Sequence, residues 1–274
     1  MDIYHEIVKL REEGRRGALA TIINVRGSIP SFETAKMLVR DDDTIAGTVG
    51  GGCVEAEVWQ AAREVMETEK PRTLTFDLNN NPKYDTGLVC GGSLEIFIEP
   101  VLPVPQLFIF GAGHVAHSIY RAARYVGFDV TVVDDRETYA NRERFPDAEQ
   151  VLVSEYETAI SSLPLDSRSY VVVVTRGHAD DMRILRTLVR SGVEHRYLGM
   201  IGSERKFLSI RKELEVEGIA PARLDRVFSP MGLDIGAITP DEIAVSVMAE
   251  LIAVRRGTKS PLAHLAWTKK KQTV

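Results

Sequence analysis

Apolar runs and amphipathic segments alternate regularly through the second part of the chain. Strand-like runs lie at about residues 107–110, 129–134, 149–153, 170–175 and 195–200, separated by segments with helical patterning. This alternation predicts a parallel sheet with helices on both faces. The last helix is marked by a capping box, formed by Thr239 and Glu242, with Pro240 at its first position.

The first hundred residues follow a different pattern. They begin with an amphipathic segment at about 2–13, expected to be helical, and continue with strand-like runs at 17–25 and 36–40. A helix is expected from Val54 to Glu67, because apolar residues recur there on one helical face. Ser93 to Glu99 alternates apolar and acidic residues, which is typical of a half-buried strand. This mixture predicts a small α+β domain.

Three prolines, Pro100, Pro103 and Pro105, lie close together between the two patterns. Prolines remove backbone donors and favour an extended chain, so we expect a domain boundary here. We predict an α+β domain at residues 1–100, a proline-rich linker at 101–106, and a Rossmann-like α/β domain at 107–274. A chain of 274 residues is long enough to build two such cores.

A glycine turn directly follows the first apolar run of the second domain, Gly111-Ala112-Gly113-His114-Val115-Ala116. Glycines let a backbone approach a phosphate, and the N-terminus of the following helix supplies N–H groups and partial positive charge. We therefore expect Gly111 and Gly113 to bind a phosphorylated, nucleotide-like ligand. The alternative is a Rossmann scaffold whose pocket holds nothing.

Two acidic residues, Asp134 and Asp135, end the next strand-like run, about twenty positions after the glycine turn, as a dinucleotide-type fold requires. Their carboxylates can accept hydrogen bonds from a ribose or a pterin-type ring, or they can form an exposed strand-end cap. His114 lies inside the glycine turn itself, where a cation or a donor would add to anion binding.

Two further segments follow strands at their carboxyl ends, where open α/β sheets bind ligands. Arg176 and Gly177 follow the fourth strand as a candidate phosphate-binding turn, with His178 as a candidate acid–base group. Gly202 and Ser203 follow the fifth strand, and Ser203 is the expected N-cap of a helix that offers a second anion site. A purely structural turn is the alternative for each segment.

Cys53 is the most informative side chain of the first domain. It follows three glycines and opens a helix, so backbone N–H groups and the helix dipole are expected to favour its thiolate form. A thiolate is a soft ligand that suits copper, zinc, iron–sulfur or sulfur-rich molybdenum chemistry, which makes Cys53 a candidate metal ligand. The alternative is a small, buried residue packed behind the turn. Cys90, also flanked by glycine, is the other candidate for thiol chemistry.

Composition and charge exclude several classes of protein. The net charge is −5 and neither half is basic, so no nucleic-acid partner is expected. No apolar run approaches the roughly 18 residues that span a bilayer, so no membrane partner is expected either. Two cysteines are typical of a reduced, cytoplasmic protein. They cannot by themselves hold a four-thiolate iron–sulfur cluster or a closed zinc site.

Taken together, the motifs resemble those of the XdhC/CoxI family, the accessory proteins of xanthine dehydrogenase and related molybdenum hydroxylases. In the first domain the resemblance lies in Gly27-Ser28-Ile29-Pro30, Ala35-Lys36-Met37-Leu38-Val39, Gly50-Gly51-Gly52-Cys53-Val54-Glu55 and Cys90-Gly91-Gly92. In the second it lies in Phe110-Gly111-Ala112-Gly113-His114-Val115-Ala116, Thr175-Arg176-Gly177-His178, Gly199-Met200-Ile201-Gly202-Ser203 and Pro230-Met231-Gly232-Leu233-Asp234-Ile235-Gly236-Ala237. Ser31 stands where the family usually has an arginine.

The resemblance implies a cytoplasmic chaperone that binds molybdenum cofactor, as molybdopterin or a nucleotide form of it. Such a protein protects the cofactor while a terminal sulfur is installed and delivers it to the apo-hydroxylase. The implied partners are apo-xanthine dehydrogenase or a related hydroxylase, a cysteine desulfurase as sulfur source, and a second copy in a homodimer. We expect no catalytic turnover. The competing hypothesis, which the glycine turn alone would support, is an NAD(P)-binding oxidoreductase.

Overall fold

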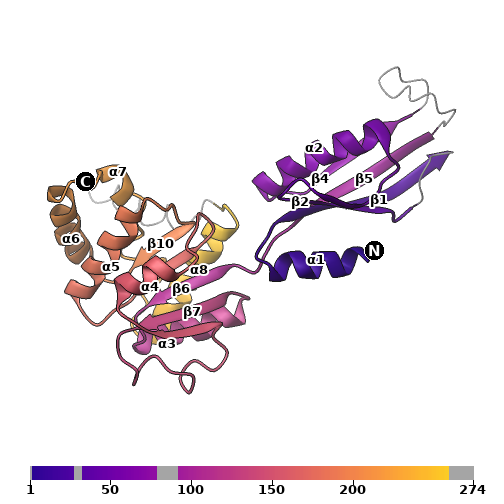
Figure 1. Cartoon of the computed structure of the whole chain (residues 1–274). Coiled ribbons are helices and arrows are strands. Elements are labelled where there is room, and N and C mark those ends of the chain that lie inside the picture. The colour runs from indigo at the N-terminus through magenta and orange to yellow at the C-terminus, as the bar shows by residue number, and fades with distance from the viewer. Residues whose placement is uncertain (1, 28–32, 79–91, 259–274) are drawn as a thin grey trace. The chain divides into compact units, whose positions relative to one another are not determined.

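The computed structural model describes residues 2–27, 33–78 and 92–258 (Figure 1). The chain forms two compact units, Met1–Val104 and Pro105–Val274. Each has its own sheet and its own apolar core. Cys90 lies outside the described residues, so its predicted role is not taken further.

The first unit is an antiparallel sheet with one helix on each face (Figure 1). The strand order is β3-β2-β1-β5-β4, and every neighbouring pair is antiparallel. Its elements are α1 (Ile3–Glu12), β1 (Gly17–Gly27), β2 (Lys36–Arg40), β3 (Ile45–Gly47), α2 (Gly52–Thr68), β4 (Arg72–Asp77) and β5 (Gly92–Val101).

Alternation along the strands explains the two layers of this unit. Ala18, Ala20 and Ile22 of β1 face the core under α2, whereas Leu19 between them faces the smaller core under α1. Because successive strand residues point to opposite faces, both helices can be buried against one sheet. β5 continues to Val101, one residue into the expected linker, because Val101 pairs with Gly17 and packs in the core under α1.

The second unit is a parallel five-stranded sheet of order β10-β9-β6-β7-β8. Its elements are β6 (Gln106–Phe110), α3 (His114–Tyr125), β7 (Asp129–Asp134), β8 (Gln150–Val153), α4 (Tyr156–Ser162), β9 (Tyr170–Val173), α5 (His178–Ser191), β10 (Tyr197–Met200), α6 (Glu204–Val216), α7 (Pro221–Leu224) and α8 (Pro240–Arg255).

Helices cover both faces of this sheet, so its central strands are buried and mainly apolar, with the sequences QLFIF in β6 and YVVV in β9. Leu107 and Ile109 of β6 face the core that α3 and α8 share, whereas Phe108 and Phe110 face the core under α4, α5 and α6. The Rossmann-like architecture predicted from the alternating pattern is therefore confirmed. None of the described helices is long and apolar enough to cross a membrane.

The helix caps predicted from local sequence are confirmed. The Thr239 side chain accepts the Glu242 N–H at the start of α8, and the Glu242 carboxylate accepts the Thr239 N–H in return, which completes the capping box. Ser203 is the N-cap of α6, where its hydroxyl accepts the N–H of Lys206. Such caps depend on residues only three positions apart, which is why sequence alone reveals them.

Candidate functional site

The carboxyl ends of β6, β7, β9 and β10 meet at one edge of the parallel sheet. The chain runs outward from β6 to β7 and β8, then returns to the other side of β6 to form β9 and β10. The connections thus diverge between β6 and β9, and this is the place where open α/β sheets bind ligands. Most of the candidate residues of the second unit lie in the loops at this edge.

The two glycines of the turn after β6 have different roles. Gly111 has φ of +113°, and a Cβ atom there would overlap the carbonyl oxygen of Val174, so only glycine fits between β6 and the end of β9. Gly113 is the N-cap of α3 with φ of −71°, and a Cβ there would meet no non-neighbouring atom of the described chain within 4 Å. Gly111 is needed for packing, whereas Gly113 leaves open space in front of a helix N-terminus.

Asp134, at the end of β7, is completely buried and holds the glycine turn in place by a hydrogen bond. One carboxylate oxygen accepts the N–H of Ala112 at 2.7 Å and Nη2 of Arg136 at 2.9 Å. The other accepts the Arg136 backbone N–H at 3.1 Å and Nε at 2.8 Å. Both oxygens are therefore occupied by donors of the protein. A direct ligand contact by Asp134 stays a prediction.

Burial opposes ionisation of Asp134, but hydrogen bonds from Arg136 and from the Ala112 N–H outweigh it and lower the pKa of the carboxyl. The same pair raises the pKa of Arg136. Arg136 also lies over the ring of Tyr139, 3.9 Å from its centre. Because both members are paired and charged, Asp134 and Arg136 form a fixed structural unit beneath the candidate ligand site.

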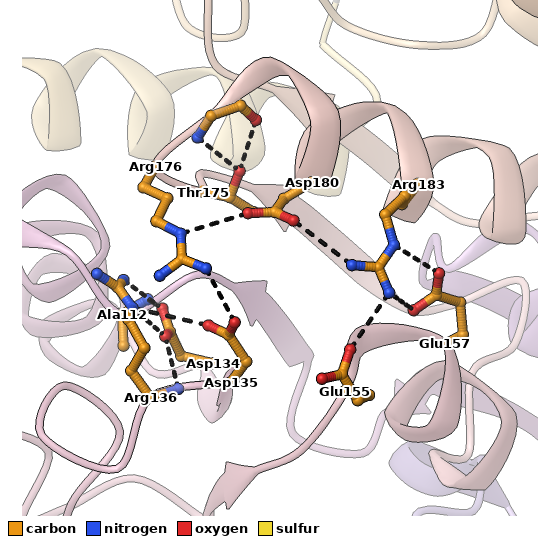
Figure 2. Close-up of polar contacts among 11 residues, drawn as sticks. Ala112, Asp134, Asp135, Arg136, Glu155, Glu157, Thr175, Arg176, Asp180 and Arg183 are labelled. Atoms are coloured by element: carbon orange, nitrogen blue, oxygen red, sulfur yellow. Dashed lines mark hydrogen bonds and ion pairs between the residues drawn. The ribbon is translucent and has the colours of Figure 1, made fainter.

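Asp135 is placed quite differently, although it is the next residue. One of its oxygens lies 3.1 Å from Nη2 of Arg176, whose Nε lies 3.5 Å from Asp180 (Figure 2). The other oxygen, Oδ1, is inaccessible to solvent and has no hydrogen-bond partner among the described residues, with Nε of Arg136 3.7 Å away. Buried acceptors normally have a donor. Asp135 thus has one oxygen paired with Arg176 and a second oxygen that lacks a hydrogen bond and is closed to solvent.

Arg176 belongs to a wider network of charged groups around this edge. Arg183 lies near Asp180 and also pairs with Glu157 and Glu155, as Figure 2 shows. The guanidinium groups of this network are outnumbered by the carboxylates they pair with, which belong to Asp134, Asp135, Asp180, Glu155 and Glu157, so its formal charge is negative. An anionic ligand must therefore be attracted by helix N-termini and by Arg176 rather than by the overall field.

Sequence reasoning missed a buried cluster that joins the turn after β9 and the start of α5 to α6. Asp181 is completely buried; its carboxylate accepts the Thr175 hydroxyl at 2.6 Å and the Thr175 N–H at 3.2 Å, and it forms an ion pair with Lys206 of α6. The cluster fixes the turn that carries Arg176 and ties it to α6. The signal available was an acidic residue in the first turns of a helix, but its lysine partner is distant in sequence.

Gly177 caps α5 as Gly113 caps α3, and there too an added Cβ would meet no non-neighbouring described atom within 4 Å. His114 and His178 are the first residues of these two helices, and both are exposed. The structure therefore places two glycine-capped helix starts with exposed imidazoles after the neighbouring strands β6 and β9. The acid–base role of His178 remains a prediction.

Lys206 contacts both residues of the turn at Gly202 and Ser203. Gly202 has φ of +147°, and an added Cβ would stand 2.8 Å from Cδ of Lys206. Ser203 already accepts a hydrogen bond from the Lys206 backbone. These contacts explain the glycine and the serine as structural residues, and the second anion site remains a prediction.

Cys53 is the second residue of α2 and its side chain is exposed. The alternative of a buried packing residue is therefore wrong. Before it, Gly50, Gly51 and Gly52 all have positive φ, which glycine tolerates and other residues rarely adopt. Glu55 holds this turn in place, because its carboxylate accepts the Thr48 hydroxyl and the Val49 N–H.

Comparisons with known proteins agree with this architecture. Residues 107–251 match a family model described as the XdhC Rossmann domain, and residues 10–77 match one described as the XdhC and CoxI family. A crystal structure described as a xanthine dehydrogenase from Bacillus halodurans covers 97% of this chain and 100% of its own, with a TM-score of 0.52 and 24% identity. At that identity it shows the fold alone.

Three curated relatives also match. Escherichia coli YqeB is 34% identical over 263 residues, which are 96% of this chain and 48% of YqeB, so the chain spans about half of that relative. A Bacillus subtilis protein named as a probable xanthine dehydrogenase subunit is 24% identical, over 90% of this chain and 96% of its own length. The E. coli molybdenum cofactor insertion chaperone PaoD is 22% identical, over 88% and 84% respectively. With its Rossmann match covering more than half of its length, the chain belongs to the XdhC and CoxI family.

Proposed function

We propose that this protein is a chaperone for molybdenum cofactor, which it binds and passes to xanthine dehydrogenase or a related molybdenum hydroxylase. Family membership supports this proposal, as do the names of two relatives, one a molybdenum cofactor insertion chaperone and the other a probable xanthine dehydrogenase subunit. The chain's own residues supply a place for the phosphorylated end of such a cofactor.

The observation that carries the proposal is the open space at Gly113. The glycine caps α3 after a turn that Asp134 holds from below, and no non-neighbouring described atom fills the volume that a side chain would take. A helix N-terminus left open in this way favours a phosphate group, which brings negative charge and several acceptor oxygens. The residues of this turn therefore fit the phosphate-bearing part of the cofactor.

Sulfuration of the cofactor is part of the same proposal. A cysteine desulfurase would supply the sulfur, and the exposed thiol of Cys53 is the group we expect to contact the cofactor's transferred sulfur or its molybdenum. Bound molybdenum would supply the chemistry of the client enzyme, whereas this chain would hold and protect the cofactor. We also propose that the protein acts as a homodimer and without turnover.

Mass spectrometry of small molecules tests the proposal directly. The full chain is expressed in cells with an intact molybdenum-cofactor pathway, purified and denatured, and the released molecules are identified. A pterin cofactor in stoichiometric amount is the expected result. A folded Gly113→Val variant prepared in parallel should contain little. Protein that carries no pterin under these conditions would overturn the proposal.

An NAD(P)-binding oxidoreductase is the second candidate, because the turn at Gly113 and the acidic pair at the end of β7 also match a nicotinamide dinucleotide site. Titration of NADH and NADPH, followed by nicotinamide fluorescence, separates the two functions. Tight binding of either nucleotide, with hydride transfer to an acceptor, would favour the oxidoreductase. Fluorescence that stays unchanged would exclude nicotinamide binding and leave the chaperone.

A further inference from the structure

We infer that the outer face of α8 is the surface through which two copies of this chain associate, with their α8 helices antiparallel. This face, here called the α8 stripe, consists of Glu242, Val245, Ala249, Ile252 and Arg256. The inference rests on the homodimer of the proposed function and names its contact surface. Three observations carry it: exposed apolar side chains on the stripe, the spacing of its residues, and the opposite charges at its two ends.

The helix α8 is apolar on two opposite sides. Its inner side packs into the core that it shares with α3, through the buried residues Ala244, Val247, Met248 and Leu251. On the outer side Val245 is 59% exposed and Ile252 is 38% exposed, and Ile238 just before the helix is 84% exposed. A surface helix ordinarily carries polar residues opposite its buried side. An exposed apolar surface with charged residues at its rim is typical of a protein–protein contact.

The helix α5, on the other face of the same sheet, shows the ordinary arrangement. Away from its core it carries Arg183, Arg186 and Arg190, each of which pairs with a glutamate. The corresponding side of α8 carries Val245 and Ile252 instead. Because apolar atoms gain free energy when they leave water, the α8 stripe favours a partner that covers it.

The stripe has the spacing of a coiled-coil seam. From Glu242 to Arg256 its residues follow one another at intervals of three, four, three and four positions. On a helix with about 3.6 residues per turn, this spacing keeps the side chains on one narrow face, which fits a second helix along its length. The middle position is Ala249, whose small side chain lets the second helix approach closely.

The two ends of the stripe carry opposite charges. Glu242 is exposed in the first turn of α8, and Arg256 is exposed at its C-cap. Oε2 of Glu242 accepts the N–H groups of Ile238 and Thr239, whereas its Oε1 accepts no hydrogen bond from the described residues. Arg256 makes no ion pair within the described part of the chain. Both charges can therefore pair with a group outside the chain.

These charges make the stripe complementary to itself in one orientation. Ala249 lies seven positions from Glu242 and seven from Arg256. An antiparallel pair centred on Ala249 thus brings Glu242 of each copy level with Arg256 of the other, and it places Val245 within about 1.5 Å, along the axis, of Ile252 of the other copy. The helix dipoles also oppose each other in this orientation. A parallel pair would align the dipoles and bring like charges together, so we expect the antiparallel pair.

The contact should be a weak one. With 16 residues α8 is about 24 Å long, and one side of a helix about 10 Å wide covers only a few hundred Å². Standard interfaces bury about 800 Å² on each partner. We therefore expect a dimer that dissociates on dilution, with a Kd in the micromolar range.

Sedimentation velocity of the full-length protein, over a series from nanomolar to high micromolar concentration, tests the inference. The wild type should change from monomer to dimer along the series. Val245→Glu should raise the Kd of the dimer at least tenfold, because it places a charge in the apolar contact from both copies. Leu208→Glu is the matched control, since Leu208 is 55% exposed on α6 and outside the stripe, and it should leave the Kd unchanged. Thermal melts followed by circular dichroism check that both variants fold.

Cysteine cross-linking tests the orientation, in a chain whose natural cysteines are replaced by serine. Ala249→Cys should form a disulfide between two copies, and Val245→Cys should link to Ile252→Cys when the two variants are mixed. Val245→Cys alone should link poorly, because its two copies lie about 12 Å apart along the antiparallel pair, beyond the roughly 7 Å that a disulfide spans between Cα atoms. Efficient linkage of Val245→Cys to itself would indicate a parallel contact and overturn the inference.

Charge reversal tests the ends of the stripe. Arg256→Glu brings a carboxylate level with Glu242 of the other copy, so it should raise the Kd of the dimer by about threefold or more at low salt and by less at high salt. Arg205→Glu makes the same change of charge at an exposed position of α6 and should have no effect. Equal Kd values for the two variants would contradict the pairing of Glu242 with Arg256.

The outcomes separate this inference from the proposed function. A dimer that Val245→Glu leaves intact would overturn the inference alone, because the homodimer would then use another surface. A wild type that stays monomeric at the highest concentration would overturn the inference and the homodimer together. Cofactor binding would still stand in that case, because mass spectrometry of the released molecules measures it independently.

Discussion

The carboxylate of Asp134 accepts a hydrogen bond from the backbone N–H of Ala112, and the two atoms are 2.7 Å apart. This contact ties the end of β7 to the turn that follows β6, where the candidate phosphate site begins. Arg136 compensates the buried charge from the other side. The turn is therefore held in one conformation before any ligand binds, which reduces the ordering cost of binding.

Asp134→Asn should destabilise the second unit by about 2–3 kcal/mol, because an amide cannot accept the hydrogen bonds of Arg136 on both sides and leaves that charge without a partner. Urea denaturation, followed by circular dichroism, measures this difference. Asp129→Asn at the other end of β7 is the control and should change the unfolding free energy by less than about 0.5 kcal/mol. Equal effects of the two substitutions would contradict the structural role of Asp134.

The stability that Asp134 contributes should depend on pH in a defined direction. Its pKa in the folded protein lies below the ordinary value of 3.8. A lowered carboxyl pKa gives stability that is complete above the unfolded value and is lost as the pH falls through the folded one. The difference in unfolding free energy between wild type and Asp134→Asn should therefore be constant above about pH 5 and shrink below pH 3.8. A difference that grows on acidification would have the wrong sign.

We expect Gly111→Ala to lower the stability of the fold and Gly113→Val to lower ligand affinity in a protein that still folds. Alanine at position 111 would require φ of +113° and would overlap the Val174 carbonyl, so a loss of at least about 2 kcal/mol in stability is expected. Valine at position 113 has ordinary φ and open space, so the variant should fold. Its affinity for pterin cofactor or adenine nucleotide should nevertheless fall at least tenfold, about 1.4 kcal/mol. Unchanged affinity in folded Gly113→Val would exclude this turn as the phosphate site.

Local patterns predicted most of the fold, because strand alternation and helix caps are encoded by residues a few positions apart. Ser203 and Thr239 are such cases. The roles of Asp134 and Asp135 could not be separated in the same way. They are adjacent and chemically identical, and only the packing of β7 against the glycine turn makes one completely buried and leaves the other with an oxygen that lacks a hydrogen bond.

The cluster of Asp181 and Lys206 escaped prediction for a related reason. The two residues are 25 positions apart, and they meet because β9 and β10 are neighbours in the sheet, which brings α5 and α6 together. The sequence also did not decide whether the side chain of Cys53 is buried or exposed. A glycine-rich turn before a helix is compatible with a buried or an exposed thiol, and the path of the chain through Gly50 to Gly52 decides it.

Lys206→Met should destabilise the second unit by about 3 kcal/mol, because it leaves the completely buried carboxylate of Asp181 without its cation. Thermal unfolding measures the loss. Lys212→Met, an exposed position on the same helix, is the matched control and should shift the midpoint little. Equal midpoints for the two variants would show that the buried ion pair contributes nothing to the fold.

Cys53→Ser should abolish retention of sulfurated cofactor while leaving the fold intact. The side chain is exposed at the start of α2, so exchange of sulfur for oxygen removes a soft ligand without disturbing a core. Cofactor content and its sulfur are measured by mass spectrometry after expression with the desulfurase. Ala56→Ser adds a hydroxyl at another exposed position of the same helix and should retain normal content. Full sulfurated cofactor in Cys53→Ser would show that the thiol does not contact it, and the sulfur-handling part of the proposed function would then have to be abandoned.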